Sequence, residues 1–276
     1  MKLIVTTHEL MAALSNKKKD LLIVDARPFH DYVKGHIPGA VNMDVMQFHW
    51  IDSSNPGIAH FNRQMKILLS NIGVTRKKEV IFYDKISGQS AARGVWLLLY
   101  FSHTKVAMLD GGSDKWKEDG YMTETKSHPF IHSSFKGTEN PKILADLKEI
   151  KSSLKKKSVV LVDARSRPEF EGKIIRAAHG GHIPRAMNIE WKENIENNVF
   201  KSSKELQEVY SNLSKDSEII TYCQGGYRAA NSFIALKMLG YKNVKIYLGS
   251  WGEWGNKPGL PITEFRKKGF ILRRPN

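Results

Sequence analysis

Short apolar runs alternate with stretches of helical periodicity along the whole chain. The runs that are typical of buried parallel strands lie at 21–25, 80–84, 106–109, 161–163, 219–222 and 244–248. Between them, amphipathic helices are predicted at 8–15, 61–71, 91–101, near 203–213 and at 229–239. Because strands that alternate with helices form parallel sheets, the pattern predicts an α/β fold with helices on both faces of each sheet.

The second half of the chain repeats the first. LLIVDAR at 21–27 returns as VVLVDAR at 159–165, and GHIPGAVNMD at 35–44 returns as GHIPRAMNIE at 181–190. EVIFYD and VAMLDGGSDKW, at 79–84 and 106–116, correspond in the same order to EIITYC and VKIYLGSWGEW, at 218–223 and 244–254. A repeat of this length is far longer than a solenoid unit, so each copy is predicted to be a domain.

The copies are separated by a segment without apolar periodicity. Residues 123–141 are rich in Ser, Thr, Pro and Lys, a composition typical of a linker. We therefore expect a first domain over 1–125, a linker over 126–141 and a second domain over 142–276.

The composition is that of an ordinary globular protein, with 41% hydrophobic and 26% charged residues among 276. A single cysteine excludes a disulfide framework and a site built from several thiolates. No apolar run approaches the length of a membrane span, and the apolar stretch near the amino terminus is too short for a secretory signal. A soluble, cytoplasmic protein is the expectation.

The charge is strongly positive: 43 Lys and Arg against 28 Asp and Glu give +15. Such a field attracts anions. The basic runs, at 17–19, 155–157 and in the tail 264–276, come without any zinc-finger or RNA-binding signature, so we expect solvated surface and no nucleic-acid partner.

The single cysteine stands where a parallel α/β sheet places its ligands. Cys223 follows the predicted strand 219–222, and a helix begins about Arg228, after Gln224, Gly225, Gly226 and Tyr227. Two glycines let the loop curl so that its N–H groups point inward, and the helix terminus adds partial positive charge. Such surroundings favour the thiolate, so the loop predicts attack by a thiolate on an anionic substrate.

The duplicated VDAR and GHIPGAVN blocks, the loop CQGGYR and the segment GSWGEWGNKPGLPI resemble the rhodanese family, specifically its tandem-domain sulfurtransferases. The resemblance covers essentially the whole chain. It implies two tandem rhodanese-like domains, of which the second is catalytic. Asp84 takes the cysteine position in the first copy, and a carboxylate cannot carry a transferred sulfur. We therefore expect an inactive first loop whose carboxylate caps the next helix.

The length and charge of the second loop separate the activities found in this superfamily. Four residues lie between Cys223 and Arg228, whereas the loops of the related phosphatases and arsenate reductases have one more. By resemblance, Arg228 favours thiosulfate, because mercaptopyruvate enzymes have a loop with little charge. The prediction is thus a thiosulfate sulfurtransferase that forms a persulfide on Cys223. A 3-mercaptopyruvate sulfurtransferase and a protein-interaction or sulfur-delivery module remain the alternatives.

Candidate substrate-binding and structural residues also lie outside the loop. Arg185, in GHIPRAMN, is expected to contact the substrate with residues 224–228, and Arg176 lies in an insertion that the first copy lacks. Asp163 and Arg165 recur as Asp25 and Arg27 in the copy without cysteine, so an ion-pair network is expected there. We expect no cofactor and no metal, a small anionic donor, a thiol or sulfur-carrier acceptor, no membrane contact and a monomer.

Overall fold

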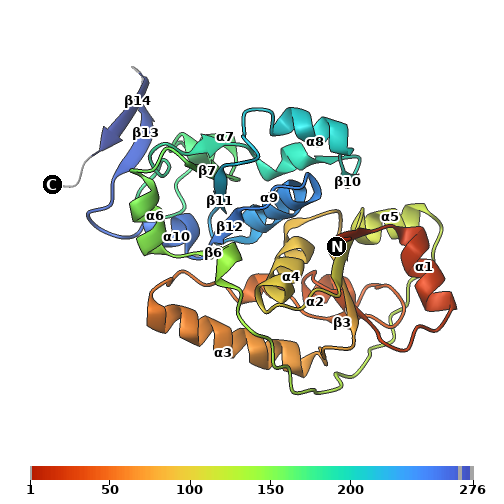
Figure 1. Ribbon diagram of the computed structural model, residues 1–276. Helices are drawn as coiled ribbons and strands as arrows, with labels where there is room; N and C mark the ends of the chain where they lie inside the picture. The colour runs from red at the N-terminus through yellow and green to blue at the C-terminus, as the bar shows by residue number, and fades with distance from the viewer. Residues whose placement is uncertain (1, 267–268, 274–276) are drawn as a thin grey trace. The chain divides into compact units, whose positions relative to one another are not determined.

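The computed structural model describes residues 2–266 and 269–273 and contains two five-stranded parallel sheets (Figure 1). The first has the order β1-β5-β4-β2-β3, with β1 (Ile4–Val5), β2 (Leu21–Asp25), β3 (Val41–Asn42), β4 (Glu79–Tyr83) and β5 (Val106–Leu109). The second repeats this order as β6-β12-β11-β7-β8, with β6 (Leu144–Ala145), β7 (Val159–Asp163), β8 (Met187–Asn188), β11 (Glu218–Tyr222) and β12 (Val244–Tyr247). The predicted α/β fold with two tandem sheets is confirmed.

The α-helices follow the same duplication. The first five are α1 (Thr7–Ser15), α2 (Phe29–Tyr32), α3 (Asn55–Asn71), α4 (Gln89–Tyr100) and α5 (Gly112–Glu118). Among the described residues of the second half they are α6 (Leu147–Ser153), α7 (Arg167–Phe170), α8 (Ser203–Val209), α9 (Tyr227–Met238) and α10 (Ser250–Trp254). Short 3₁₀ turns lie at η1 (Val45–Gln47), η2 (Pro141–Ile143) and η3 (Trp191–Asn194), and antiparallel hairpins pair β9 (Ile195–Glu196) with β10 (Val199–Phe200) and β13 (Ile262–Arg266) with β14 (Gly269–Arg273).

The described residues fall into two compact units. Unit 1 is drawn from 1–49, 59–140 and 195–201, and unit 2 from 50–58, 141–194 and 202–276. Each unit therefore includes a short segment from the other half of the sequence. In unit 2, for example, the backbone N–H of Ser53 donates to Oε1 of Glu253 at 3.1 Å.

Helices cover both faces of the sheet in unit 1. Alternate strand residues such as Ile23, Ile81 and Leu109 pack on one face with Leu10 of α1 and Trp116 of α5. Phe82 points to the opposite face, where its ring lies so close to Gly94 of α4 that a Cβ there would sit 2.4 Å from it. The strands are buried on both sides, which is why they appear in the sequence as continuous apolar runs.

Unit 2 is built in the same way. Leu161 and Ile220 pack with Ile150 of α6 and Trp254 of α10 on one face, while Thr221 on the other face donates to the carbonyl of Ala229 in α9 at 3.1 Å. The central strand β11 ends at Tyr222, so the loop that leads into α9 begins with Cys223.

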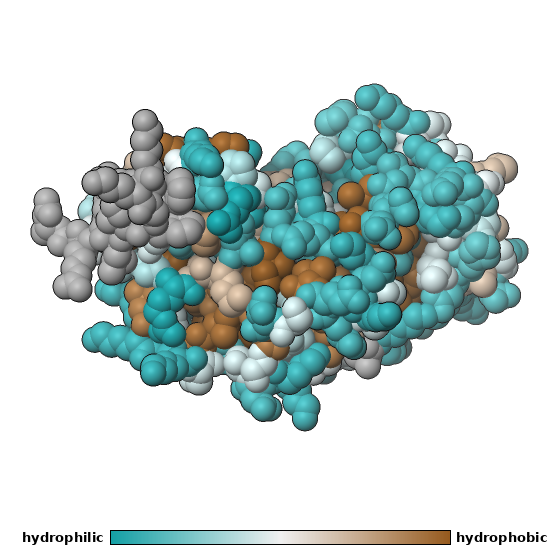
Figure 2. All heavy atoms as spheres, turned by 90° about the horizontal axis from the view of Figure 1, so that it is seen from above, coloured by the Kyte–Doolittle hydropathy of each residue, from teal (hydrophilic) through white to brown (hydrophobic). Residues whose placement is uncertain are grey.

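Polar residues cover most of the face drawn in Figure 2, with smaller hydrophobic areas among them. The lysines at 17–19 and 155–157 are exposed, as expected for solvated surface. The third basic run includes residues 267–268 and 274–276, which lie outside the described residues. Within the described chain, no helix is both long enough and apolar enough to cross a bilayer.

Candidate active site

Cys223 lies at the centre of a tightly curled loop between β11 and α9. Its side chain is buried, and the backbone N–H of Gly226 donates to Sγ at 3.1 Å. Gly226 has φ +87°, a left-handed conformation that residues with a Cβ rarely adopt, and this turns its N–H back toward the sulfur. An N–H donor aimed at sulfur stabilises a thiolate or a persulfide, because both carry negative charge.

Hydrogen bonds from the amino-terminal end of α10 fix the path of the Cys223 loop. The N–H groups of Trp251 and Gly252 donate to the carbonyls of Cys223 and Gln224 at 2.9 and 2.8 Å. The hydroxyl of Ser250 accepts from the N–H of Cys223 at 3.3 Å and donates to the carbonyl of Tyr247 at 2.9 Å. With two of its carbonyls tied to α10, the loop keeps a fixed path in which an N–H group faces the sulfur.

Arg228 lies in the first turn of α9, and its guanidinium is held by a carboxylate. Its Nη1 and Nη2 donate to Glu169 at 2.5 and 3.0 Å, and both side chains are largely buried. Burial lowers the pKa of Arg228, but the hydrogen bond to Glu169 and the charge of Cys223 raise the pKa by more than burial lowers it. The net pKa is therefore above its ordinary value, and the guanidinium stays ionised. The loop therefore carries a permanent positive charge in a fixed position.

Arg176 belongs to the same group. Its Nε lies 3.3 Å from Oε1 of Glu169, and its backbone carbonyl accepts from Nε2 of Gln224 at 3.0 Å. The Arg176 side chain is 60% exposed, in contrast to the buried Arg228. The insertion that the first copy lacks thus brings a solvent-accessible guanidinium to the edge of the Cys223 loop.

Glu169 was not predicted as a site residue. The sequence signal for it is Ser166-Arg167-Pro168-Glu169, a capping-box pattern, and Oε2 of Glu169 does accept from the Ser166 hydroxyl at 2.9 Å. The Glu169 carboxylate therefore takes part in the cap of α7 and also pairs with Arg228. Burial would raise its pKa, but the hydrogen bonds from Arg228 and Ser166 outweigh burial and lower it to about 2.

Glu169 is expected to make stability depend on pH in acid. The pKa of Glu169 is about 2 in the folded chain, against an ordinary value of 4.5. The ionised carboxylate therefore stabilises the fold above pH 4.5 by about 3 kcal/mol, and this contribution is lost as the pH falls toward 2. Urea unfolding of wild type and Glu169→Gln from pH 6 to pH 2 measures it. The stability difference between the two proteins should shrink as the pH falls. A difference independent of pH would show that the charge of Glu169 is not what stabilises the unit.

The predicted ion pair is present in both copies. Nε and Nη2 of Arg165 donate to the two carboxylate oxygens of Asp163 at 2.9 and 2.6 Å, and Nη2 also donates to the carbonyl of Gly181 at 2.8 Å. Arg27 makes the same bonds to Asp25 and to the carbonyl of Gly35. The recurrence of this arrangement in a copy without cysteine supports a structural role.

The first-copy loop is arranged as a helix cap. Oδ2 of Asp84 accepts from the backbone N–H of Ser90, in the first turn of α4, at 2.9 Å, and Oδ1 accepts from the N–H of Lys85 at 2.7 Å. Burial raises the pKa of the Asp84 carboxyl. The predicted capping role of this carboxylate is confirmed.

The structure does not bring Arg185 to the Cys223 loop. Its Nη1 donates to the carbonyls of Ser153, Leu154 and Lys156 at the end of α6, at 3.3, 2.7 and 3.2 Å. These carbonyls precede β7, at the sheet edge opposite to Cys223, because Cys223 follows the carboxyl end of β11 and β7 runs parallel to it. A guanidinium held there caps a helix, so the expected substrate contact has no support from this geometry.

Comparison with known proteins gives the same assignment for the chain as a whole. The Rhodanese-like domain family matches residues 6–119 and 146–257. A thiosulfate sulfurtransferase of Pseudomonas aeruginosa is 30% identical, with 88% of this chain and 91% of the relative covered. The sulfur carrier protein TtuD of Thermus thermophilus is 32% identical, with 95% and 97% covered. The crystal structure of the Escherichia coli 3-mercaptopyruvate sulfurtransferase SseA superposes with a TM-score of 0.76 at 26% identity, with 91% of this chain and 99% of that one covered.

The family match spans both copies, and the relatives that carry it are aligned over nearly their full length. The similar proteins are named a thiosulfate sulfurtransferase, a sulfur carrier protein and a 3-mercaptopyruvate sulfurtransferase, so what their names share is the handling of sulfur. The chain belongs to the rhodanese family, as a tandem-domain sulfurtransferase.

Proposed function

We propose that the chain transfers the outer sulfur of thiosulfate to a thiophilic acceptor through a persulfide on Cys223. The observation that carries this proposal is the N–H of Gly226, which points at Sγ of Cys223 in a loop whose following helix begins with Tyr227 and Arg228. The residues that would surround the donor are the loop residues Gln224, Gly225, Gly226, Tyr227 and Arg228.

The first step is displacement at sulfur. The thiolate of Cys223 attacks the outer sulfur of thiosulfate, a new S–S bond forms, and the S–S bond of the donor breaks with its electron pair leaving on sulfite. The negative charge moves to the outer sulfur of the persulfide, where the loop N–H groups stabilise it.

The second step regenerates the enzyme. An acceptor such as cyanide attacks the outer sulfur, the persulfide bond breaks, and thiocyanate leaves while Cys223 returns to the thiolate. A thiolate acceptor reacts in the same way and departs as a persulfide. Since the two half-reactions are separate, the kinetics should show a double-displacement pattern.

Charge favours thiosulfate over 3-mercaptopyruvate as the donor. Thiosulfate is a dianion, and two guanidinium groups, those of Arg176 and Arg228, lie around the loop. Both guanidinium groups pair with Glu169, but the Arg176 side chain is 60% exposed whereas that of Arg228 is 15% exposed, so we assign the first contact with the donor to Arg176. Steady-state kinetics with both donors and cyanide test the assignment, and a higher kcat/KM for 3-mercaptopyruvate would overturn it.

Arg176→Ala is expected to raise the KM for thiosulfate about three- to tenfold with little change in kcat, because an exposed charge at the rim mainly affects capture of the anion. Arg167→Ala is the matched control. It removes an arginine of similar exposure, 58%, that pairs with Glu171 in the same segment. Equal increases in KM for the two variants would assign the effect to net charge and remove Arg176 from the site.

A sulfur-delivery role is the second candidate, because a relative with near-complete coverage is named a sulfur carrier protein. In this reading the acceptor is a protein thiol and thiocyanate formation is incidental. Trapping of an acceptor by wild type but not by Cys223→Ala in a pull-down would favour it.

A further inference from the structure

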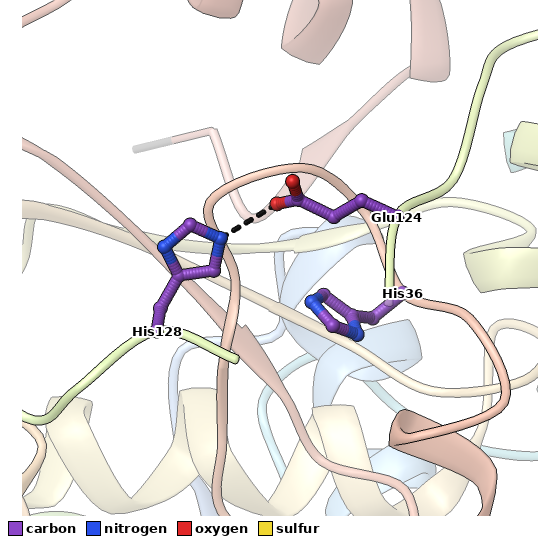
Figure 3. A group of neighbouring side chains, drawn as sticks. All are labelled: His36, Glu124 and His128. Atoms are coloured by element: carbon purple, nitrogen blue, oxygen red, sulfur yellow. Dashed lines mark hydrogen bonds and ion pairs between the residues drawn. The ribbon is translucent and has the colours of Figure 1, made fainter. Parts of the chain in front are cut away.

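A second group of chemically capable side chains lies in unit 1, in the copy without cysteine. His36, Glu124 and His128 each offer one ligand atom, and these atoms all lie within 4.8 Å of one another (Figure 3). His36 is buried, and the other two side chains are half-buried. The histidine precedes β3, whereas Glu124 and His128 follow α5, so the fold brings together residues that are far apart in the sequence.

Two of the three side chains are held in place by the backbone. Nδ1 of His36 lies 2.9 Å from the carbonyl of Tyr32, and its ring stacks on the Tyr32 ring with centroids 3.8 Å apart. Oε1 of Glu124 accepts from the N–H of Gly39 at 2.6 Å and lies 2.6 Å from Nε2 of His128. A hydrogen bond from one ring nitrogen to a carbonyl is how proteins orient a metal-binding histidine, because it leaves the other nitrogen for the ion.

Nε2 of His36 faces an acceptor atom of the backbone. This nitrogen lies 3.1 Å from the carbonyl oxygen of Lys126, while Nδ1 already faces another carbonyl. A neutral imidazole has one N–H, so with Nδ1 donating, the lone pair on Nε2 would point at an oxygen. A metal ion at Nε2 would take this lone pair and the carbonyl oxygen as ligands, and Glu124 and His128 offer two more ligand atoms within 4.8 Å.

The second copy shows which part of the cluster the fold requires. His182, the counterpart of His36, also has Nδ1 close to a carbonyl, that of Phe170 at 2.8 Å, and stacks on the Phe170 ring. His36 is bridged to Glu124, but His182 is bridged to Thr263. The oriented histidine is therefore common to both copies, whereas the carboxylate and the second histidine belong to the first.

We propose that His36, Glu124 and His128 bind a divalent transition-metal ion, for which Zn²⁺ is the best match. Imidazole and carboxylate are ligands of Zn²⁺ at about 2.0–2.2 Å, so tetrahedral neighbours stand about 3.3 Å apart. Oε1 of Glu124 and Nε2 of His128, which are 2.6 Å apart, would move apart, and the other ligand atoms, which lie within 4.8 Å, would move closer together to reach this value. The Lys126 carbonyl already stands near that separation from His36 and can serve as the fourth ligand. The ion would fasten the segment 124–128 to the loop that contains His36 and Gly39.

The test uses the full chain with Cys223→Ser, so that the only thiolate cannot bind the metal. After chelation and dialysis, Zn²⁺ binding is measured by calorimetry, and Co²⁺ is added separately to record the visible absorption of a tetrahedral site. We expect one ion per chain, release of protons on binding, and a higher unfolding temperature with metal.

His128→Ala and Glu124→Gln in the same background should each weaken binding by at least about 100-fold, because loss of an outer-shell partner alone costs 10- to 100-fold. His132→Ala, an exposed histidine four residues from His128, is the matched control and should leave binding unchanged. Far-ultraviolet circular dichroism of each metal-free variant verifies that it is folded. Absence of stoichiometric binding, or binding that survives both substitutions, would overturn the proposal.

Discussion

Replacement of Cys223 by serine is expected to abolish thiocyanate formation from thiosulfate and cyanide, with kcat/KM reduced by at least about a thousandfold. The serine hydroxyl stays protonated in the same loop, and an oxygen in place of Sγ cannot form the persulfide. The buried side chain has nearly the same size, so the N–H of Gly226 and the contacts of the loop with α10 can remain. The loss should therefore be chemical and not structural.

Intact-protein mass spectrometry measures the covalent step directly. After incubation with thiosulfate, the wild type should gain about 32 Da, which cyanide removes, while Cys223→Ser should gain nothing. Because Cys223 is the only cysteine in the chain, the gain has one possible thiol. A parallel incubation with 3-mercaptopyruvate ranks the donors. Full thiocyanate production by a folded Cys223→Ser protein would refute the mechanism, and a gain with neither donor would favour the sulfur-delivery role.

The sequence predicted the central strands well because they are buried on both faces. Leu21–Asp25 and Val106–Leu109 were predicted with the same bounds, since the first is an apolar run that ends at a buried aspartate and the second is a continuous apolar run. The outer strands β1, β3, β6 and β8 have two residues each, too few to show any period. Pairing with a neighbouring strand, which no local pattern encodes, defines them.

The hydrophobic pattern and the internal repeat also do not predict that each unit includes a short segment from the other half of the sequence. A repeat suggests that each copy folds from its own residues, yet the hydroxyl and N–H of Ser53 bond to Glu253 in unit 2. Likewise the carbonyl of Asn198 accepts from the N–H of Ser87 in unit 1 at 2.9 Å. Such contacts join residues that are more than a hundred positions apart, and periodicity carries no information about them.

At the site, the sequence located the residues of the loop but not those that hold it. Cys223 and Arg228 are marked by their position after a strand and before a helix. Glu169 and Ser250 act through tertiary contacts, and their local patterns indicate only a helix cap and a turn. The group His36, Glu124 and His128 was not predicted for the same reason, since His36 lies 88 positions before Glu124 and no ligand spacing connects them.

Asp163→Ala is expected to lower the free energy of unfolding by about 3–5 kcal/mol, a large fraction of the total for a single domain. Asp163 is fully buried, and the Arg165 side chain is 2% exposed, so the substitution leaves a guanidinium without its countercharge inside unit 2. The carbonyl of Gly181 and the ring of Trp251, whose centroid lies 4.5 Å from the guanidinium carbon, cannot replace a carboxylate. Urea unfolding of the full chain, followed by tryptophan fluorescence, measures the loss.

The double variant Asp163→Ala/Arg165→Met separates an unpaired charge from lost packing. If the cost lies in the buried charge, removal of both partners should recover more than half of the stability, because an apolar side chain of similar length replaces the guanidinium. The pair Asp25→Ala and Asp25→Ala/Arg27→Met is the matched control, since the same bonds exist in unit 1 with no cysteine nearby. Similar losses and recoveries of stability in the two copies would establish that the Asp–Arg pair stabilises the fold in both units. A loss of stability below about 1 kcal/mol for Asp163→Ala, which is the range of an exposed ion pair, would contradict the role of Asp163 as a buried countercharge. A loss of stability confined to the second copy would connect the Asp163–Arg165 pair to the Cys223 loop instead.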